Sequence, residues 1–128
     1  MRAKALLSLQ RKATVTLHRI RLRRPWQCEP AGEGACWRRR FHRPTGLGPD
    51  TQVWIVLGGF SAAGTMRLNG QALGRLDPER PECRFDATGA MCPENELAID
   101  LDAPAPAALP KGADPPGEVA LEIDRKRG

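Results

Sequence analysis

The chain contains no tyrosine, and only three Trp and three Phe residues supply its aromatic side chains. Tyrosine is enriched where a binding surface buries a ring and keeps a hydroxyl available, so its absence argues against a ligand site rich in aromatic stacking. No apolar run approaches the ~20 residues of a membrane-spanning helix. The apolar stretch at residues 5–9 ends at Gln10, short of the roughly 7 to 15 residues in the core of a secretory signal. We therefore expect a soluble, cytoplasmic protein without membrane association.

Residue sets that support catalysis or metal binding are also missing. The four cysteines are Cys28, Cys36, Cys83 and Cys92. Their separations differ from the close Cys pairs of structural zinc sites, and His18 and His42 do not complete a recognisable ligand set. No nucleophile has a recognisable His partner, and no glycine-rich phosphate loop occurs. We predict a protein that is not an enzyme and uses no metal or cofactor, with reduced cysteines packed as small apolar residues.

The length of 128 residues suits one domain with a buried core. It leaves no room for a catalytic barrel of roughly 250 residues in addition. We expect one domain over residues 1–128, with residues 1–11 disordered. Residues 103–117 contain five prolines and no periodicity, which predicts a long, stiff loop.

The net charge of +5 is placed unevenly, because residues 1–44 carry +10 and residues 45–128 carry −5. Arginines alternate in two basic segments, as Arg19 and Arg21 in one and Arg38 and Arg40 in the other. Pairing of these segments as strands would gather guanidinium groups on one face, which suits phosphate or carboxylate ligands. These four arginines are candidate anion-binding residues for nucleic acid or an acidic glycan. The alternative is a solvated face neutralised by the acidic residues between positions 96 and 124.

Alternation of polar and apolar residues predicts short antiparallel strands. From residue 14 the apolar side changes beyond His18, which predicts a bulge there. Residues 36–43 also alternate, with Trp37, Arg39 and Phe41 on one side. Residues 53–57 are apolar on both faces, as expected for a central strand covered by a second layer. Residues 96–101 and 118–124 have one polar face.

Turn signals separate these strands. Asn69-Gly70 predicts a two-residue hairpin turn between residues 66–69 and 71–76, because type I′ turns require positive φ at both central positions. Residues 29–34 (Glu-Pro-Ala-Gly-Glu-Gly) are predicted to be a loop from their composition. About eight strands, and no helix beyond a turn at residues 87–91, predict an all-β protein with an antiparallel β-sandwich.

Five short motifs occur in order within residues 36–101. They are Trp-Arg-Arg-Arg-Phe at 37–41, Gly-Phe-Ser-Ala-Ala at 59–63, Asn69-Gly70 followed by Gly74, Phe-Asp-Ala-Thr at 85–88, and Pro-Glu-Asn-Glu-Leu at 93–97. This order resembles the sugar-binding jelly-roll domain, of the galactose-binding type, in family 2 glycoside hydrolases, the β-galactosidase and β-glucuronidase group. The resemblance implies a jelly roll that binds carbohydrate. It carries over no catalytic carboxylate, because those residues lie on a barrel domain that this chain lacks.

The resemblance places Asn69 where a hairpin Asn can contact sugar, and flat Trp rings suit the CH faces of sugars. Asn69, Trp26 and Trp54 are therefore candidate carbohydrate contacts. The alternatives are structural, since Asn tolerates left-handed φ in turns and a small sandwich needs large core residues. We expect a non-catalytic carbohydrate-binding module. The alternatives are a basic protein that binds polyanions and a scaffold that binds a protein partner without a small ligand.

Overall fold

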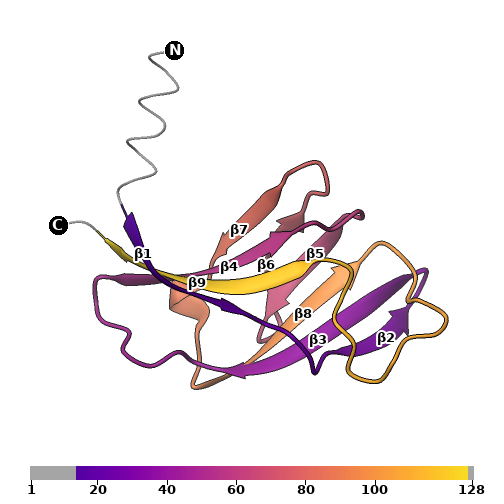
Figure 1. The fold of residues 1–128 in the computed structure, drawn as a ribbon, viewed down its shortest axis with the longest axis horizontal. Helices are drawn as coiled ribbons and strands as arrows, with labels where there is room; N and C mark the ends of the chain where they lie inside the picture. The colour runs from indigo at the N-terminus through magenta and orange to yellow at the C-terminus, as the bar shows by residue number, and fades with distance from the viewer. Residues whose placement is uncertain (1–13, 127–128) are drawn as a thin grey trace, which may run out of the picture.

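The computed structural model describes residues 14–126, and nine strands form two antiparallel sheets there. One sheet has the order β1-β9-β4-β7, and the other has the order β2-β3-β8-β5-β6. The strands of the first sheet are β1 (Thr14–Arg21), β9 (Glu118–Lys126), β4 (Thr51–Gly58) and β7 (Glu82–Asp86). Those of the second are β2 (Gln27–Ala31), β3 (Gly34–His42), β8 (Glu94–Leu101), β5 (Gly64–Leu68) and β6 (Gln71–Leu76). The two sheets face each other (Figure 1), which confirms the predicted all-β sandwich.

The core lies between the sheets and is built from the apolar side of each strand. In β4, Ile55 and Leu57 face inward, and in β8 the residues Leu97 and Ile99 do the same; all four are fully buried. Burial of alternate apolar side chains on two facing sheets is the main force that holds a sandwich together. The predicted central strand is confirmed, because β4 has β9 on one side and β7 on the other.

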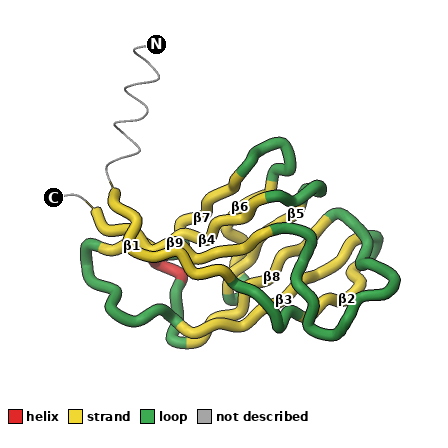
Figure 2. The backbone as a smooth tube through the Cα atoms, viewed as in Figure 1, coloured by secondary structure: helices red, strands yellow, loops and turns green. Residues whose placement is uncertain are grey.

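Several predicted local features are confirmed. The pairing of β1 with β9 shifts register between Thr16 and His18, where the bulge was expected. Leu68 pairs with Gln71 across the Asn69-Gly70 turn, and both turn residues have positive φ. The turn expected at residues 87–91 is the short 3-10 helix η1 (Thr88–Ala90), and residues 103–117 form a loop (Figure 2).

The prediction of a loop at residues 29–34 was wrong. Residues 29–31 belong to β2, which pairs with β3 as a hairpin that turns at Gly32-Glu33. Pro30 is compatible with this strand because β2 lies at the edge of its sheet, where a missing N–H breaks no ladder. Gly32 has φ of 61°, which allows the tight turn.

The two chain ends enter and leave the sandwich side by side, since Thr14 pairs with Lys126 (Figure 1). The predicted disorder of residues 1–11 lies outside the described residues. Among residues 14–126, no helix has the length and apolar character needed to cross a membrane.

Candidate binding groove at one edge of the sandwich

A groove lies where the two sheets open at one edge. β1 is the last strand of its sheet, and β2 ends its pairing with β3 at Arg38, so residues 39–42 of β3 are uncovered on that side. The groove encloses about 850 Å³. We call it the edge groove, and the residues that line it are Ile20, Arg21, Leu22, Arg39, Arg40, Phe41, His42, Pro44, Asn69, Glu94, Asn95, Glu96 and Leu121.

The edge groove combines apolar and charged groups. Leu22, Phe41 and Leu121 are core residues that reach it, and Ile20, a large apolar side chain, is 42% exposed. Arginine, histidine and glutamate side chains complete the lining. Such a surface offers van der Waals contact to an apolar face and hydrogen bonds to polar substituents.

Arg39 lies in the wall of this groove and is held by backbone carbonyls. Its Nε donates to the carbonyl of Arg23 at 2.6 Å, and its Nη1 donates to the carbonyl of Arg40. Arg23 follows β1, so the Arg39 side chain bridges the gap between the two sheets. Among the described residues, no carboxylate lies within ion-pair distance of Arg39.

The other arginines of the edge groove have partners of opposite charge. Arg40 lies 3.8 Å from Glu96, and Arg21 lies 2.6 Å from Glu118. Glu94 lies 4.0 Å from Nδ1 of His42, and both side chains are highly exposed. Exposed pairs of this kind contribute little to stability, so these groups are available to a ligand at small cost.

Asn69 lines the edge groove, but its amide serves the fold. Its Oδ1 accepts from the backbone N–H of Glu96 at 2.9 Å, and its Nδ2 donates to the carbonyl of Ala90 and to Oδ1 of Asn95. Asn95 is 3% exposed and also bonds the N–H and the carbonyl of Cys92. Both amide hydrogens of Asn69 are therefore engaged in tying the β5–β6 turn to the start of β8.

The two candidate tryptophans lie elsewhere. Trp26 is 2% exposed, and its indole N–H donates to the carbonyl of Leu22 at 2.9 Å, so its ring belongs to the core. Trp54 points to the outer side of the β1-β9-β4-β7 sheet. There Cζ of Arg84 lies 5.1 Å from the centroid of the Trp54 ring, as in a cation–π contact. Among residues 14–126, the buried N–H of Trp54 has no hydrogen-bond partner.

The four candidate anion-binding arginines do not line one paired face, although Arg21 and Arg40 both line the edge groove. β1 pairs with β9, whereas β3 pairs with β2 and β8, so the two basic segments lie in different sheets and the conjectured pairing does not occur. Each of the four has a carboxylate within 4 Å. The pairs are Arg19 with Glu82 and Glu122, Arg21 with Glu118, Arg38 with Glu29, and Arg40 with Glu96. Acidic residues between positions 96 and 124, named in the alternative above, are partners of Arg19, Arg21 and Arg40, whereas the partner of Arg38 is Glu29.

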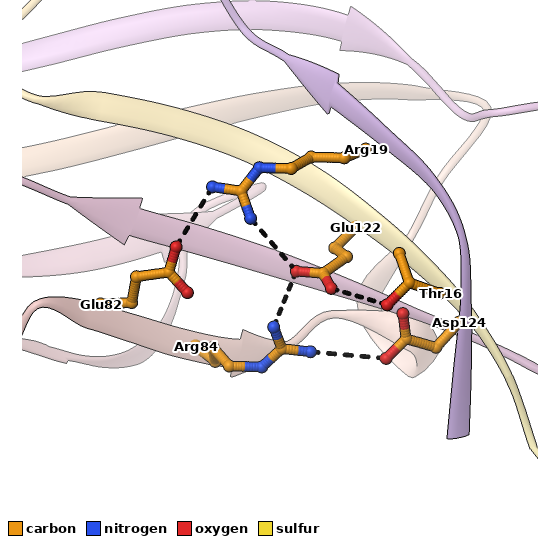
Figure 3. A network of polar contacts seen from close by, with 6 residues as sticks. All are labelled: Thr16, Arg19, Glu82, Arg84, Glu122 and Asp124. Atoms are coloured by element: carbon orange, nitrogen blue, oxygen red, sulfur yellow. Dashed lines mark hydrogen bonds and ion pairs between the residues drawn. The ribbon is translucent and has the colours of Figure 1, made fainter. Parts of the chain in front are cut away.

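A polar network covers the outer side of β9 (Figure 3). Glu122 and Asp124 are 8% and 2% exposed. Arg84 bonds Glu122 at 2.7 Å and Asp124 at 3.4 Å, and Thr16 donates to Glu122 at 2.9 Å (Figure 3). The network supplies hydrogen-bond and ion-pair partners to two buried carboxylates.

Excess positive charge lies outside the described part of the chain. All 15 Asp and Glu residues fall within residues 14–126, which also contain 15 of the 20 Lys and Arg residues, so this part has zero net charge. The remaining basic residues are Arg2, Lys4, Arg11, Lys12 and Arg127.

The cysteines are unpaired thiols in distinct settings. Cys28 and Cys36 sit on opposite faces of the β2–β3 ladder, since Cys28 is opposite Trp37 and Cys36 is opposite Glu29. Burial is the main factor that raises the pKa of the Cys36 thiol, and a hydrogen bond with Asp100 adds to it. A raised pKa lowers the thiolate fraction and hence reactivity. In residues 14–126, no three Cys, His, Asp or Glu side chains cluster as metal ligands would.

Sequence reasoning did not single out Arg39 or Ile20 as site residues. It did place Arg39 on the same side of its strand as Trp37 and Phe41, and a charge at a core-facing position is itself a signal. Such a residue either guards a sheet edge or points into a cavity. Ile20 gave no comparable signal, because its exposure depends on which strand neighbours β1.

Comparison with known proteins supports the fold. No protein-family model and no curated sequence matches the chain. A solved structure, that of Bifidobacterium dentium β-glucuronidase complexed with coumarin-3-O-glucuronide, superposes with a TM-score of 0.65 over 89% of this chain, at 16% identity. The match covers 30% of that enzyme's chain. The resemblance to a domain of family 2 glycoside hydrolases, predicted from the motifs, is thus confirmed for the fold.

Proposed function

We propose that this chain is a non-catalytic module that binds a carbohydrate, or a similar polyhydroxyl ligand, in the edge groove. The observation that carries the proposal is the lining of that groove. Ile20, Leu22 and Phe41 supply apolar contact, and charged side chains surround them. A sugar presents CH groups on one face and hydroxyl groups at its rim, so it matches both parts of this surface.

Two further features support the proposal. The fold matches part of an enzyme that acts on a sugar conjugate, which is an analogy of fold and not of site. The groove carboxylates, Glu94 and Glu96, are exposed and face His42 and Arg40. Solvated carboxylates suit hydrogen bonds to ligand hydroxyls.

A glycan array, followed by titration calorimetry with each glycan that scores, tests the proposal. Ile20→Thr keeps a β-branched residue in the strand and removes apolar contact, so it should weaken binding several-fold. The control is Ala72→Thr. Ala72 is exposed and lies in β6, the strand at the far edge of the β2-β3-β8-β5-β6 sheet, so this change should leave affinity unchanged. Failure of the folded protein to bind any glycan at millimolar concentration would reject the carbohydrate proposal and favour the scaffold.

The polyanion alternative is distinguished by its salt dependence. Contacts with phosphates release counterions, so affinity for DNA or heparin should fall steeply with salt concentration, and binding to a neutral sugar should not. A polyanion that contacted Arg19, Arg21, Arg38 or Arg40 would also meet the carboxylate close to each of them, and this repulsion opposes binding.

A further inference from the structure

The guanidinium of Arg39 is fixed in the wall of the edge groove by two carbonyl groups. Nε donates to the carbonyl of Arg23 and Nη1 donates to the carbonyl of Arg40, so two hydrogen bonds fix the orientation of the guanidinium plane. A guanidinium has five N–H bonds. Nη2 has no partner among the described residues and is available for a further acceptor.

Arg39 differs from the other arginines of the groove in its charge balance. Arg21 and Arg40 each face a carboxylate, at 2.6 and 3.8 Å, whereas Arg39 is bonded only to neutral carbonyls. Carbonyl groups satisfy hydrogen bonds without cancelling the charge. Because Arg39 is partly buried, solvent and salt screen this charge less than they screen an exposed one.

We propose that Arg39 is the anchor of a carboxylate-binding subsite in the edge groove, so that the ligand class is a saccharide bearing a carboxylate. This inference rests on the proposed function. A carboxylate in the groove would accept charge-assisted hydrogen bonds from the uncommitted N–H groups of Arg39. Such bonds are about twice as strong as neutral ones.

The rest of the groove narrows the ligand chemistry. Glu94 and Glu96 lie on β8, and their oxygens accept hydrogen bonds from hydroxyl groups but repel further anionic groups. A polyphosphate would meet this repulsion, and a neutral sugar would leave Arg39 without a counter-charge. A ligand with one carboxylate and several hydroxyls, such as a uronic acid, offers an anionic group to Arg39 and hydrogen-bond donors to Glu94 and Glu96.

The test uses a matched pair of probes, a galactose trimer in which one unit is galacturonic acid and the all-galactose trimer, so that the acidic probe carries one carboxylate. Wild-type protein should bind the acidic trimer at least about tenfold more tightly, the effect of one charge-assisted contact. Arg39→Gln should abolish this preference and retain binding of the neutral trimer. Arg39→Lys, which keeps the charge but not the planar fork, should restore part of the preference.

The control is Arg80→Gln, which removes one exposed arginine from the connection between β6 and β7 and should keep the full preference. Circular dichroism and thermal unfolding show whether Arg39→Gln is folded, and Arg39→Met serves in its place if it is not. Equal affinity of wild-type protein for the two trimers overturns the carboxylate subsite alone. A preference for the acidic trimer that survives in Arg39→Gln, or in Arg39→Met where that variant takes its place, overturns the subsite as well. Failure to bind either trimer or any arrayed glycan overturns the proposed function as well.

Discussion

The backbone of Gly74 in β6 lies against the ring of Phe85 in β7, so closely that a Cβ on residue 74 would stand 2.6 Å from Cε1 of the ring. β6 and β7 belong to different sheets. The contact therefore joins the two layers at the edge opposite the groove, where the chain itself passes from one sheet to the other. It also explains why two motifs of the sequence, the Gly after Asn69-Gly70 and the Phe of residues 85–88, occur together.

Gly74→Ala should destabilise the protein by about 1–3 kcal/mol, because the added methyl group forces the Phe85 ring or a strand to move. Urea unfolding measures the change. Gly89→Ala is the matched control, since a Cβ there meets nothing within 4 Å and the φ of Gly89 is ordinary. Phe85→Leu in the Gly74→Ala background should recover part of the loss. Equal stability of the two glycine variants would contradict the contact.

Replacement of Asn95 by Ala should cost about 2–3 kcal/mol of folding free energy. It removes the buried side chain of Asn95 together with its bonds to both backbone groups of Cys92 and to Asn69, and these groups then lack their partners within the fold. At position 69, where φ is 53°, Asn69→Ala should be less stable than Asn69→Gly by about 1 kcal/mol, because Gly tolerates this φ and Ala does not. Equal stability of the two Asn69 variants would show that the turn does not hold this φ.

Arg84→Met should destabilise the protein by roughly 2 kcal/mol. The change removes one ion-pair partner from each of two buried carboxylates, and the figure is reduced from that of a fully buried pair because the Arg84 side chain is 37% exposed. Glu122 would keep Arg19 at 3.5 Å and Thr16 at 2.9 Å but lose its shortest ion pair, so adding Glu122→Met, which replaces this weakly compensated buried carboxylate by an apolar side chain, should recover part of the loss. Thermal unfolding of the two variants and the wild type provides the comparison. A double variant no more stable than Arg84→Met would refute this explanation.

The ion pair between Arg67 and Asp100 should make stability depend on pH in acid. Burial opposes ionisation of Asp100, but hydrogen bonds from Arg67 and Cys36 outweigh it, so the pKa of Asp100 is below its ordinary value. A lowered folded-state pKa stabilises the fold above the unfolded-state pKa of about 3.9, and this contribution is lost as pH falls through the folded-state pKa.

Arg67→Met should therefore lose less stability than wild type on acidification from pH 6 to below pH 3, measured by urea unfolding at each pH. Arg40→Gln controls for the removal of one arginine, since the Arg40 side chain is 89% exposed. Parallel pH profiles for wild type and Arg67→Met would rule out the assignment to Asp100.

Strand periodicity predicts most of this fold because each inward-facing residue must be buried. The phase change at His18 required a bulge, and Asn69-Gly70 required a hairpin; the structure has both. β2 was missed because its composition is that of a loop. Pro30 is compatible with a strand because β2 lies at the edge of its sheet. The order of strands in a sheet depends on the whole chain, so a local sequence pattern cannot predict it.

The candidate site was harder to predict for the same reason. The edge groove exists because β1 and β3 face each other across two sheets, and their residues are about 20 positions apart in sequence. The alternation of arginines was correctly seen, but their neutralisation depends on cross-strand partners such as Glu118 and Glu96. The fold role of Asn69 depends in turn on Asn95, which only the pairing of β5 with β8 brings close.

The most direct test of the central claim is a titration of isotope-labelled protein with the all-galactose trimer and with the trimer that carries one galacturonic acid unit, followed through backbone amide chemical shifts. We predict that the shifts that change with ligand concentration belong to residues 20–22, 39–42 and 94–96, which line the edge groove. Saturable changes confined to the outer face around Trp54 and Arg84, or to the end of the sandwich at Arg125 and Lys126, would contradict the assignment of the ligand site to this groove.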